Sequence, residues 1–263
     1  RRDVQAIAVC FLWSTVNPAH ELRARKIIHE IWPEVPVTLS HELNPIPREY
    51  RRAISTVIDA SLHPIVSAYT KALSGALEEN GFDTDHFLVA TCTGGMIPPD
   101  AIMAKPIFSV MSGPTLAPVA AQHLTNAPDV VVVDMGGTTF DVAAIRDGRL
   151  IVNDEAMIGD DMLGIPKVDV RSVGAGGGSI AWVDVGSMIC VGPQSASAHP
   201  GPACYGMGGT APTVTDANLV LGLIDPDDFL GGRMPLDPVA AEMVVSALGQ
   251  KLGLGLIETA LTI

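Results

Sequence analysis

The run from Asp134 to Asp141 has the residue types of a loop that binds phosphate groups. It reads Asp-Met-Gly-Gly-Thr-Thr-Phe-Asp and follows the apolar segment 130–133. Glycines let backbone N–H groups approach phosphate oxygens, threonine hydroxyls add donors, and a carboxylate at a strand end can hold Mg²⁺ through water. A plain glycine hairpin beside an exposed acid is the alternative. The combination of glycine, threonine and acid favours the phosphate loop.

A second glycine-rich run, 174–179, reads Gly-Ala-Gly-Gly-Gly-Ser. Its glycine spacing differs from that of a dinucleotide-binding fingerprint. The sequence after it, 180–185, is typical of a strand, whereas that fingerprint requires a helix. A turn that needs positive φ angles would also explain the glycines. The pattern therefore argues against a dinucleotide site.

His199 and Cys204 lie five residues apart in a loop rich in proline and glycine. An imidazole and a thiolate could contribute to a metal site or to acid–base chemistry. Two ligands do not make a zinc site, and no paired base for Cys204 is evident, so a structural or substrate-lining role is favoured. Asp216 follows a strand-like run, where its carboxylate could face a cleft or compensate the charge of a helix N-terminus.

The elements before residue 91 are expected to form a β-α-β unit and a long helix. An apolar run ends near Leu12, a helical pattern covers 21–31, and alternation marks 35–39. From Glu49 to Leu77, apolar residues recur at steps of three and four, which predicts an amphipathic helix that Pro64 kinks or splits. The stripe consists of Ile54, Val57, Ile58, Leu62, Ile65, Tyr69 and Leu73, while Arg48, Arg51 and Arg52 are expected on the exposed face and first turn.

After residue 106, short apolar segments alternate with glycine-rich turns. Segment 130–133 is expected to be a buried strand, and a strand over 140–145 leads to the hairpin signal Asp147-Gly148. A second domain is expected to begin near residues 91–106. Further strands are expected around 168–173, 180–185 and 188–191, and helices over 216–223 and 238–252.

The overall composition argues against several classes of protein. The 263 residues are 48% hydrophobic and 17% charged, which predicts a folded protein of one or two domains. A formal net charge of −13 opposes general polyanion binding, so nucleic acid is not an expected partner. The apolar runs are too short to cross a bilayer, and no membrane association is expected. The four cysteines form no Cys-x-x-Cys pair and are expected to be reduced thiols in a cytoplasmic protein.

The candidate phosphate loop resembles the second phosphate motif of the actin, sugar-kinase and heat-shock chaperone superfamily of ATPases. In its setting, 130–143, it resembles the corresponding segment of the hydantoinase A/5-oxoprolinase family. Three further stretches agree with that family in the same order along the chain. They are the Arg-Glu-Tyr-Arg-Arg run from Arg48, the Ser-Gly-Pro run from Ser112, and the run 201–206 followed by 212–218.

This resemblance implies an α/β fold class, with an actin-like (ribonuclease H-like) ATPase lobe and a partial N-terminal α/β domain. Residues 1–90 would be the C-terminal part of the family's N-terminal domain, and 91–263 part of its core domain. Family members carry another glycine–threonine phosphate loop upstream, and none precedes residue 91 here. The chain is therefore expected to hold one side of an ATP cleft.

The resemblance also implies an enzyme that uses ATP and Mg²⁺ to phosphorylate the carbonyl oxygen of a cyclic amide, such as a hydantoin or 5-oxoproline, before water opens the ring. The expected partner is a B-type subunit in a hetero-oligomer. Asp134 is assigned to Mg²⁺ and Asp141 to cation or water positioning, both as catalytic residues. Nucleotide binding is assigned to Gly136, Gly137, Thr138, Thr139, Gly176 and Gly177, and substrate binding to His199 and Asp216.

Two alternatives stay open. The related subunit of ATP-dependent ketone carboxylases, of the acetone or acetophenone type, uses the same kind of phosphorylation to activate a ketone as its enol. A truncated or paralogous piece that binds a partner without turning over ATP would explain the missing upstream loop. Phosphate release that depends on a cyclic amide, or on a ketone with bicarbonate, distinguishes the two enzymes.

Overall fold

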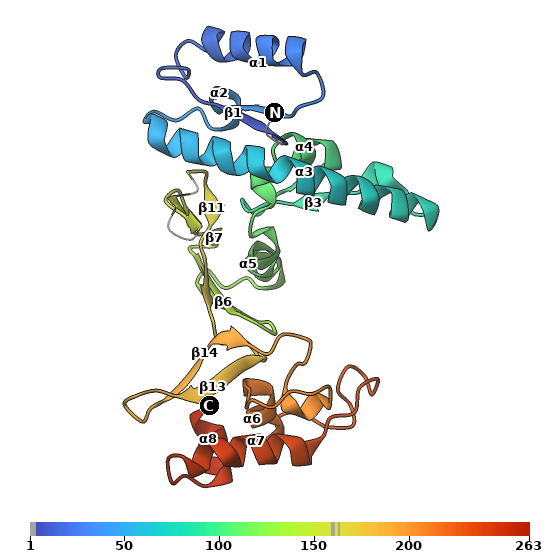
Figure 1. Cartoon of the computed structure of the whole chain (residues 1–263), viewed down its shortest axis with the longest axis vertical. Helices are drawn as coiled ribbons and strands as arrows, with labels where there is room; N and C mark the ends of the chain where they lie inside the picture. Colours follow the sequence, from blue (N-terminus) through green and yellow to red (C-terminus); the bar gives the residue numbers. More distant parts are fainter. Residues whose placement is uncertain (1–3, 159–160, 163) are drawn as a thin grey trace. The chain divides into compact units, whose positions relative to one another are not determined.

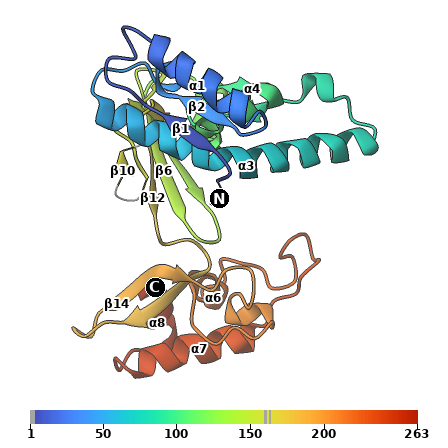
Figure 2. The same cartoon turned by 45° about the horizontal axis from the view of Figure 1, so that its top comes forward.

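The computed structural model describes residues 4–158, 161–162 and 164–263, and its fold is α/β, as predicted (Figures 1 and 2). Contacts divide the chain into two compact units. Unit 1 comprises Arg1–Val132 and Ala144–Val170, and unit 2 comprises Val133–Ala143 and Arg171–Ile263. The boundary expected at residue 91 separates the N-terminal domain of the resembled family from its core domain, and this division stays a prediction.

Unit 1 contains the predicted β-α-β unit. Strands β1 (Ile7–Val9) and β2 (Val37–Leu39) pair in parallel, and α1 (Ala19–Ile31) connects them. Helices α2 (Ser40–Leu43) and α3 (Glu49–Glu79) follow. Figure 2 shows α3 as one long helix beside β1 and β2. The elements that come next in unit 1 are η1 (Thr84–His86), β3 (Val89–Ala90), β4 (Met96–Ile97), α4 (Pro99–Ala104), η2 (Pro106–Ser109) and α5 (Ser112–Leu124).

Helix α3 differs from its prediction in two respects. It continues through Pro64, so of the two predicted effects, a kink or a split, the split is wrong. Its apolar stripe is also only partly covered: Val57, Ile65 and Tyr69 are each more than half exposed, and the other four residues of the stripe are partly buried. The side chains that α3 buries are mostly polar: Arg52, Ser55, Thr56, Asp59, Ala60 and Thr70.

Arg52 is the clearest correction on α3. It was expected on the exposed face, but the residue is only 2% exposed. Its guanidinium donates to the hydroxyl of Ser40 and to the carbonyl oxygens of Ile46 and Phe11, at 2.8–3.0 Å. Hydrogen bonds of this kind replace the hydration that a charged group loses on burial. Residue spacing cannot reveal such partners, which come from other segments.

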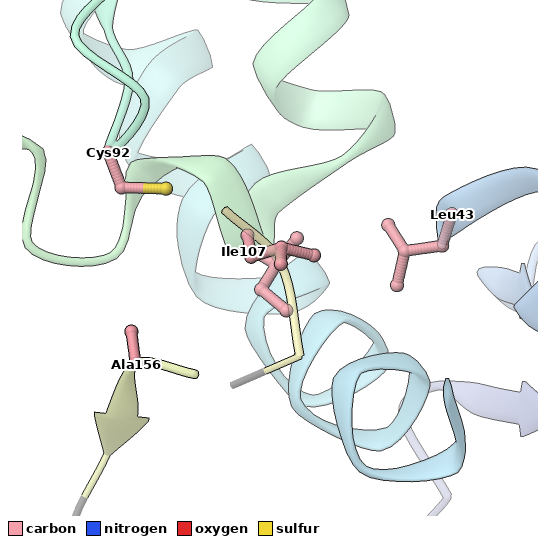
Figure 3. Packing of buried hydrophobic residues seen from close by; sticks show 5 residues of the cluster. Leu43, Cys92, Ile107 and Ala156 are labelled. Atoms are coloured by element: carbon pink, nitrogen blue, oxygen red, sulfur yellow. The ribbon is translucent and has the colours of Figure 1, made fainter. Parts of the chain in front are cut away.

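The core of unit 1 joins residues that are far apart in the sequence. Leu43, Cys92, Ile107 and Ala156 converge with Ile165 in one cluster (Figure 3). Ala156 lies between β8 (Val152–Asn153) and β9 (Met157–Ile158), and Ile165 lies between β10 (Asp161–Met162) and β11 (Lys167–Val168). β8 pairs antiparallel with β11, and β9 with β10.

Strands β5 (Val130–Met135), β6 (Phe140–Arg146) and β12 (Val170–Val173) form a sheet in the order β12-β6-β5, and β7 (Arg149–Leu150) pairs with β6. The turn Asp147-Gly148 between β6 and β7 has positive φ at both residues, as a type I′ hairpin turn requires. The predicted hairpin is confirmed. The expected burial of 130–133 is wrong, since Val131 is 72% and Val133 58% exposed. β-branched residues indicate an extended backbone, and this edge strand leaves one of its two faces open.

Unit 2 places a β-hairpin beside three helices. β13 (Ser179–Val183) pairs antiparallel with β14 (Ile189–Ser195), and α6 (Val214–Val220) lies against β13. Helices α7 (Pro238–Gln250) and α8 (Leu256–Thr262) pack against α6, and η3 (Ala203–Tyr205) precedes it in sequence. The predicted strands and helices of this region are confirmed. In the part of the chain that the structure describes, no helix has the length and apolar character needed to cross a membrane.

Candidate functional site

The loop between β5 and β6 presents a row of backbone hydrogen-bond donors. The N–H of Gly136 donates to the carbonyl oxygen of Thr139 at 2.9 Å, which closes a tight turn. Among the described residues, the N–H groups of Gly137, Thr138 and Thr139 have no acceptor. Successive N–H groups without partners are the donors that a phosphate group needs. Gly136 thus shapes the loop, and the next three residues are available to a ligand.

Two carboxylates flank these donors. Asp134, near the end of β5, is exposed, and no hydrogen bond to its carboxylate occurs within the described ranges. Asp141, in β6, is partly buried and accepts hydrogen bonds from the hydroxyl of Ser172 and, at 3.5 Å, from that of Thr139. Asp134 is therefore open to a cation, whereas the orientation of Asp141 is set by its neighbours.

A Mg²⁺ ion fits this set of oxygen donors. Mg²⁺ in nucleotide sites is commonly held by one or two carboxylates together with the phosphates of the substrate. Among the described residues, no group of three or more His, Cys, Asp or Glu side chains could hold a metal ion by itself. The site can therefore supply part of a coordination shell, through Asp134, and a nucleotide would supply the rest.

The second glycine run packs directly on the candidate phosphate loop. Gly177 N–H donates to the Gly136 carbonyl at 2.9 Å, and Gly178 N–H to the Gly137 carbonyl at 2.6 Å. A Cβ atom on Gly176 would lie 2.5 Å from the Thr139 nitrogen, so no larger residue fits. The structure thus makes this run a support for the loop. Direct contact of Gly176 or Gly177 with the nucleotide stays a prediction.

The N-terminus of α6 supports the glycine run in turn. Both the N–H and the hydroxyl of Thr215 donate to the carbonyl of Gly177, each at 2.8 Å. Asp216 is fully buried and forms a capping box with Thr213. The Asp216 carboxylate also accepts from the N–H groups of Ala203 and Cys204, at 3.3 and 2.8 Å. These bonds give Asp216 a structural role, and its contact with substrate stays a prediction.

His199 and Cys204 have opposite environments. His199 is exposed, whereas Cys204 is completely buried in the core of unit 2. Burial raises the pKa of the Cys204 thiol well above its ordinary value, and the neighbouring Asp216 carboxylate raises it further. A protonated, enclosed thiol is a poor nucleophile and metal ligand. These environments support the packed role favoured for Cys204, and of the two side chains His199 is the one accessible to a ligand.

Two residues of this arrangement were not assigned a role from the sequence: Ser172, which orients Asp141, and Thr215, which bonds to the glycine run. Gly178, which bonds to the loop backbone, belongs to the run 174–179 that the sequence had already indicated. Thr215 had a signal, because it lies in the family-like stretch 212–218. Ser172 had none, since a single serine in a strand carries no pattern.

Comparisons with known proteins show what the chain as a whole is similar to. A family model described as Hydantoinase/oxoprolinase matches residues 52–263. The chain is 38% identical over 268 residues to the caprolactamase subunit alpha of Pseudomonas jessenii, an alignment that covers 100% of this chain and 38% of that protein. It is 39% identical over 270 residues to the acetophenone carboxylase gamma subunit of Aromatoleum aromaticum, covering 98% and 36%.

A solved structure gives the same result in three dimensions. The ATP-dependent caprolactamase from Pseudomonas jessenii superposes with a TM-score of 0.80 at 37% identity, over 98% of this chain and 38% of that one. The chain therefore spans well under half the length of these relatives.

Proposed function

Because the chain belongs to the hydantoinase/oxoprolinase family, we propose that it is the nucleotide-binding part of an ATP-dependent enzyme that opens cyclic amides. The observation that carries this proposal is the loop 136–139, in which three successive N–H groups, those of residues 137–139, have no acceptor among the described residues and lie between Asp134 and Asp141 in the sequence. The similarity to a caprolactamase subunit supports a lactam as substrate. Hydantoins and 5-oxoproline belong to the same chemical class.

In the proposed reaction, the carbonyl oxygen of the cyclic amide attacks the γ-phosphorus of ATP, and ADP leaves. Water then adds to the carbon of the phosphorylated imidate, and the C–N bond breaks, which frees the amine and leaves an acyl phosphate. A second water hydrolyses the acyl phosphate to the carboxylate and phosphate. A resonance-stabilised amide resists water, and conversion of its oxygen into a phosphate leaving group lowers that barrier. Fixed N–H donors stabilise the charge on the phosphoryl oxygens during transfer.

Each residue has a place in this proposal. The N–H groups of Gly137, Thr138 and Thr139 contact phosphate oxygens, and Asp134 holds Mg²⁺, which neutralises phosphate charge. Asp141, oriented by Ser172, positions the cation or water. Gly136, Gly176 and Gly177 support the backbone of the loop. The exposed His199 contacts the substrate, and the buried Asp216 caps the N-terminus of α6.

The same reasoning extends to the architecture. We propose that the fold includes one actin-like (ribonuclease H-like) lobe, with family domains divided near residue 91. All four cysteines are free thiols, as expected for reduced residues. The cytoplasmic location stays a prediction.

A ketone carboxylase is the second candidate. The similarity to an acetophenone carboxylase subunit supports it at essentially the same identity as the lactamase. The phosphate loop would serve both enzymes, since each transfers a phosphoryl group to a carbonyl oxygen. The loop itself therefore does not distinguish them.

Calorimetric titration of Mg-ATP tests the nucleotide site. Asp134→Asn, which removes the charge and keeps the shape, is expected to weaken Mg-ATP binding by about tenfold or more, from the loss of a charge-assisted contact. Binding of ATP without metal should be unchanged or improved, because a negative charge beside the phosphates is gone. Asp228→Asn, at an exposed position in another loop, is the matched control. Equal Mg-ATP affinity of wild type and Asp134→Asn would contradict the assignment.

A further inference from the structure

We infer that Thr215 is a positioning residue for ATP, whose hydroxyl acts on the Thr138 N–H group through a chain of two peptide groups. The inference rests on the function proposed above. It concerns a residue that lies behind the phosphate loop and has no contact with phosphate in the proposed complex.

This series of hydrogen-bonded peptide groups starts at the carbonyl of Gly177. That carbonyl accepts two hydrogen bonds from Thr215, one from the N–H and one from the hydroxyl, each at 2.8 Å. That carbonyl belongs to the same peptide group as the N–H of Gly178. The Gly178 N–H donates to the Gly137 carbonyl at 2.6 Å. The Gly137 carbonyl shares its peptide group with the Thr138 N–H, one of the loop donors for which the described residues supply no acceptor.

Hydrogen-bonded peptide groups polarise one another. A carbonyl that accepts hydrogen bonds makes the N–H of its own peptide group a stronger donor, and the effect increases where water is excluded. Thr215 is only 7% exposed and Gly177 is partly buried, so water has limited access to the bonds between them. The short distance between Gly178 and Gly137 agrees with a strengthened bond. The Thr138 N–H at the end of this series of hydrogen bonds is therefore held in one orientation and made a stronger hydrogen-bond donor.

Thr215, which begins this series of hydrogen bonds, is held in place by the N-terminus of α6. Thr215 follows Thr213, the N-cap of α6, whose side chain and backbone are bonded to Asp216. Asp216 also accepts from Ala203 and Cys204, and Cys204 is part of the core that α6 and α7 share. The hydroxyl of Thr215 thus transmits the position of a packed helix to an exposed loop.

The test compares Thr215→Val, which removes the hydroxyl and keeps the β-branch, with Thr215→Ser, which retains the hydroxyl. Thr215→Ala is a second hydroxyl-free variant, in case valine disturbs the packing. Thr262→Val is the control, because that exposed hydroxyl donates only within its own helix, to Glu258. Calorimetry measures the Kd of Mg-ATP and of Mg-tripolyphosphate, a probe with a phosphate chain and no nucleoside.

We expect Thr215→Val and Thr215→Ala to raise both Kd values by the same factor, about three- to tenfold, as for loss of one hydrogen bond. Thr215→Ser and Thr262→Val should bind like wild type. The amide proton resonances of Gly178 and Thr138 should move upfield in the hydroxyl-free variants and not in Thr215→Ser. A purely structural role would lower the melting temperature without this selective shift.

The outcomes distinguish this inference from the function on which it rests. If wild type binds neither probe, the proposed nucleotide site fails and the role of Thr215 with it. If wild type binds both probes and the hydroxyl-free variants bind them equally well, the inference alone is overturned. A weaker Kd for Mg-ATP with an unchanged Kd for Mg-tripolyphosphate would also overturn it, because the defect would then lie at the nucleoside.

Discussion

Buried charged side chains are a main feature of this molecule at the residue scale. Glu21 has no exposed surface, and its carboxylate accepts hydrogen bonds from the Ser40 hydroxyl at 2.5 Å and from His41 Nδ1 at 2.6 Å. The backbone N–H groups of Phe11 and His41 also donate to it. Burial by itself raises the pKa of Glu21, but these hydrogen bonds outweigh it and lower the pKa from 4.5 to about 2.

This lowered pKa predicts a pH dependence of stability. A carboxyl whose pKa is lower in the folded state than in the unfolded state stabilises the fold above its unfolded pKa. The contribution of Glu21 should therefore be complete above about pH 4.5 and be lost as the pH falls towards 2. Urea midpoints measured across this range should fall less steeply in Glu21→Gln than in wild type. Glu258→Gln, at an exposed position, should keep the wild-type slope, and a wild-type slope in Glu21→Gln would contradict the assignment.

At the same scale, the catalytic proposal depends on which donors and acids have partners. Asp141 is already engaged by Ser172, while Asp134 and the N–H of Thr138 are open as far as the described residues extend. Cys204 is buried, and its raised thiol pKa argues against a nucleophilic role. The chemistry we propose thus needs no covalent protein intermediate.

At the scale of elements, the candidate phosphate loop is stabilised from behind. The turn between β5 and β6 would be an isolated hairpin end if the run 174–179 did not bond to it. Two hydrogen bonds, from Gly177 and Gly178, connect the two segments. A Cβ atom placed on Gly176 would lie only 2.5 Å from the Thr139 nitrogen, which shows how closely the segments approach.

Gly176→Ala tests this packing. The added methyl group must displace the loop, because backbone atoms cannot move aside as a flexible side chain does. We expect a loss of about 1–3 kcal/mol in stability, typical of overpacking, together with at least a tenfold weaker Kd for Mg-ATP by calorimetry, equivalent to about 1.4 kcal/mol. Gly255→Ala is the matched control, since nothing lies within 4 Å of a Cβ placed there. Normal Mg-ATP binding by Gly176→Ala would show that the loop does not depend on this contact.

At the scale of the whole molecule, the chain is short relative to the proteins it resembles. It covers 38% of the caprolactamase alpha subunit and 36% of the acetophenone carboxylase gamma subunit. The names of both relatives describe them as subunits. We therefore propose that activity requires a hetero-oligomer, and the alternative of a non-catalytic binding fragment becomes an outcome of the same experiment.

The expected result is that phosphate release from ATP by this chain rises only when a B-type subunit of the family and a lactam are both present. The physical reason is that phosphoryl transfer needs the carbonyl oxygen held in line with the γ-phosphate. A coupled phosphate assay, with a lactam in one arm and a ketone plus bicarbonate in the other, measures this directly. Stimulation only in the second arm would favour the carboxylase. Co-purification with the B-type subunit without release in either arm would favour the binding fragment.

The sequence by itself determined those features that depend on neighbours along the chain. Asp147-Gly148 predicted a hairpin because both residues tolerate positive φ, and the structure has that turn. The order of strands and helices in 179–250 also followed from local patterns. The loop 134–141 could be proposed as a phosphate site because its glycines, threonines and acids are consecutive.

Only the tertiary structure decided which groups are buried and which donors are free. Arg52 is buried because Phe11, Ser40 and Ile46 supply hydrogen-bond acceptors for its guanidinium. Its position in the helix had predicted exposure to solvent. Thr215 donates to Gly177, 38 residues away in the sequence, and this contact connects α6 to the glycine run that supports the phosphate loop. The physical reason is the same in both cases. A polar group's environment is set by partners that folding brings from distant segments, and residue type and spacing carry no record of them.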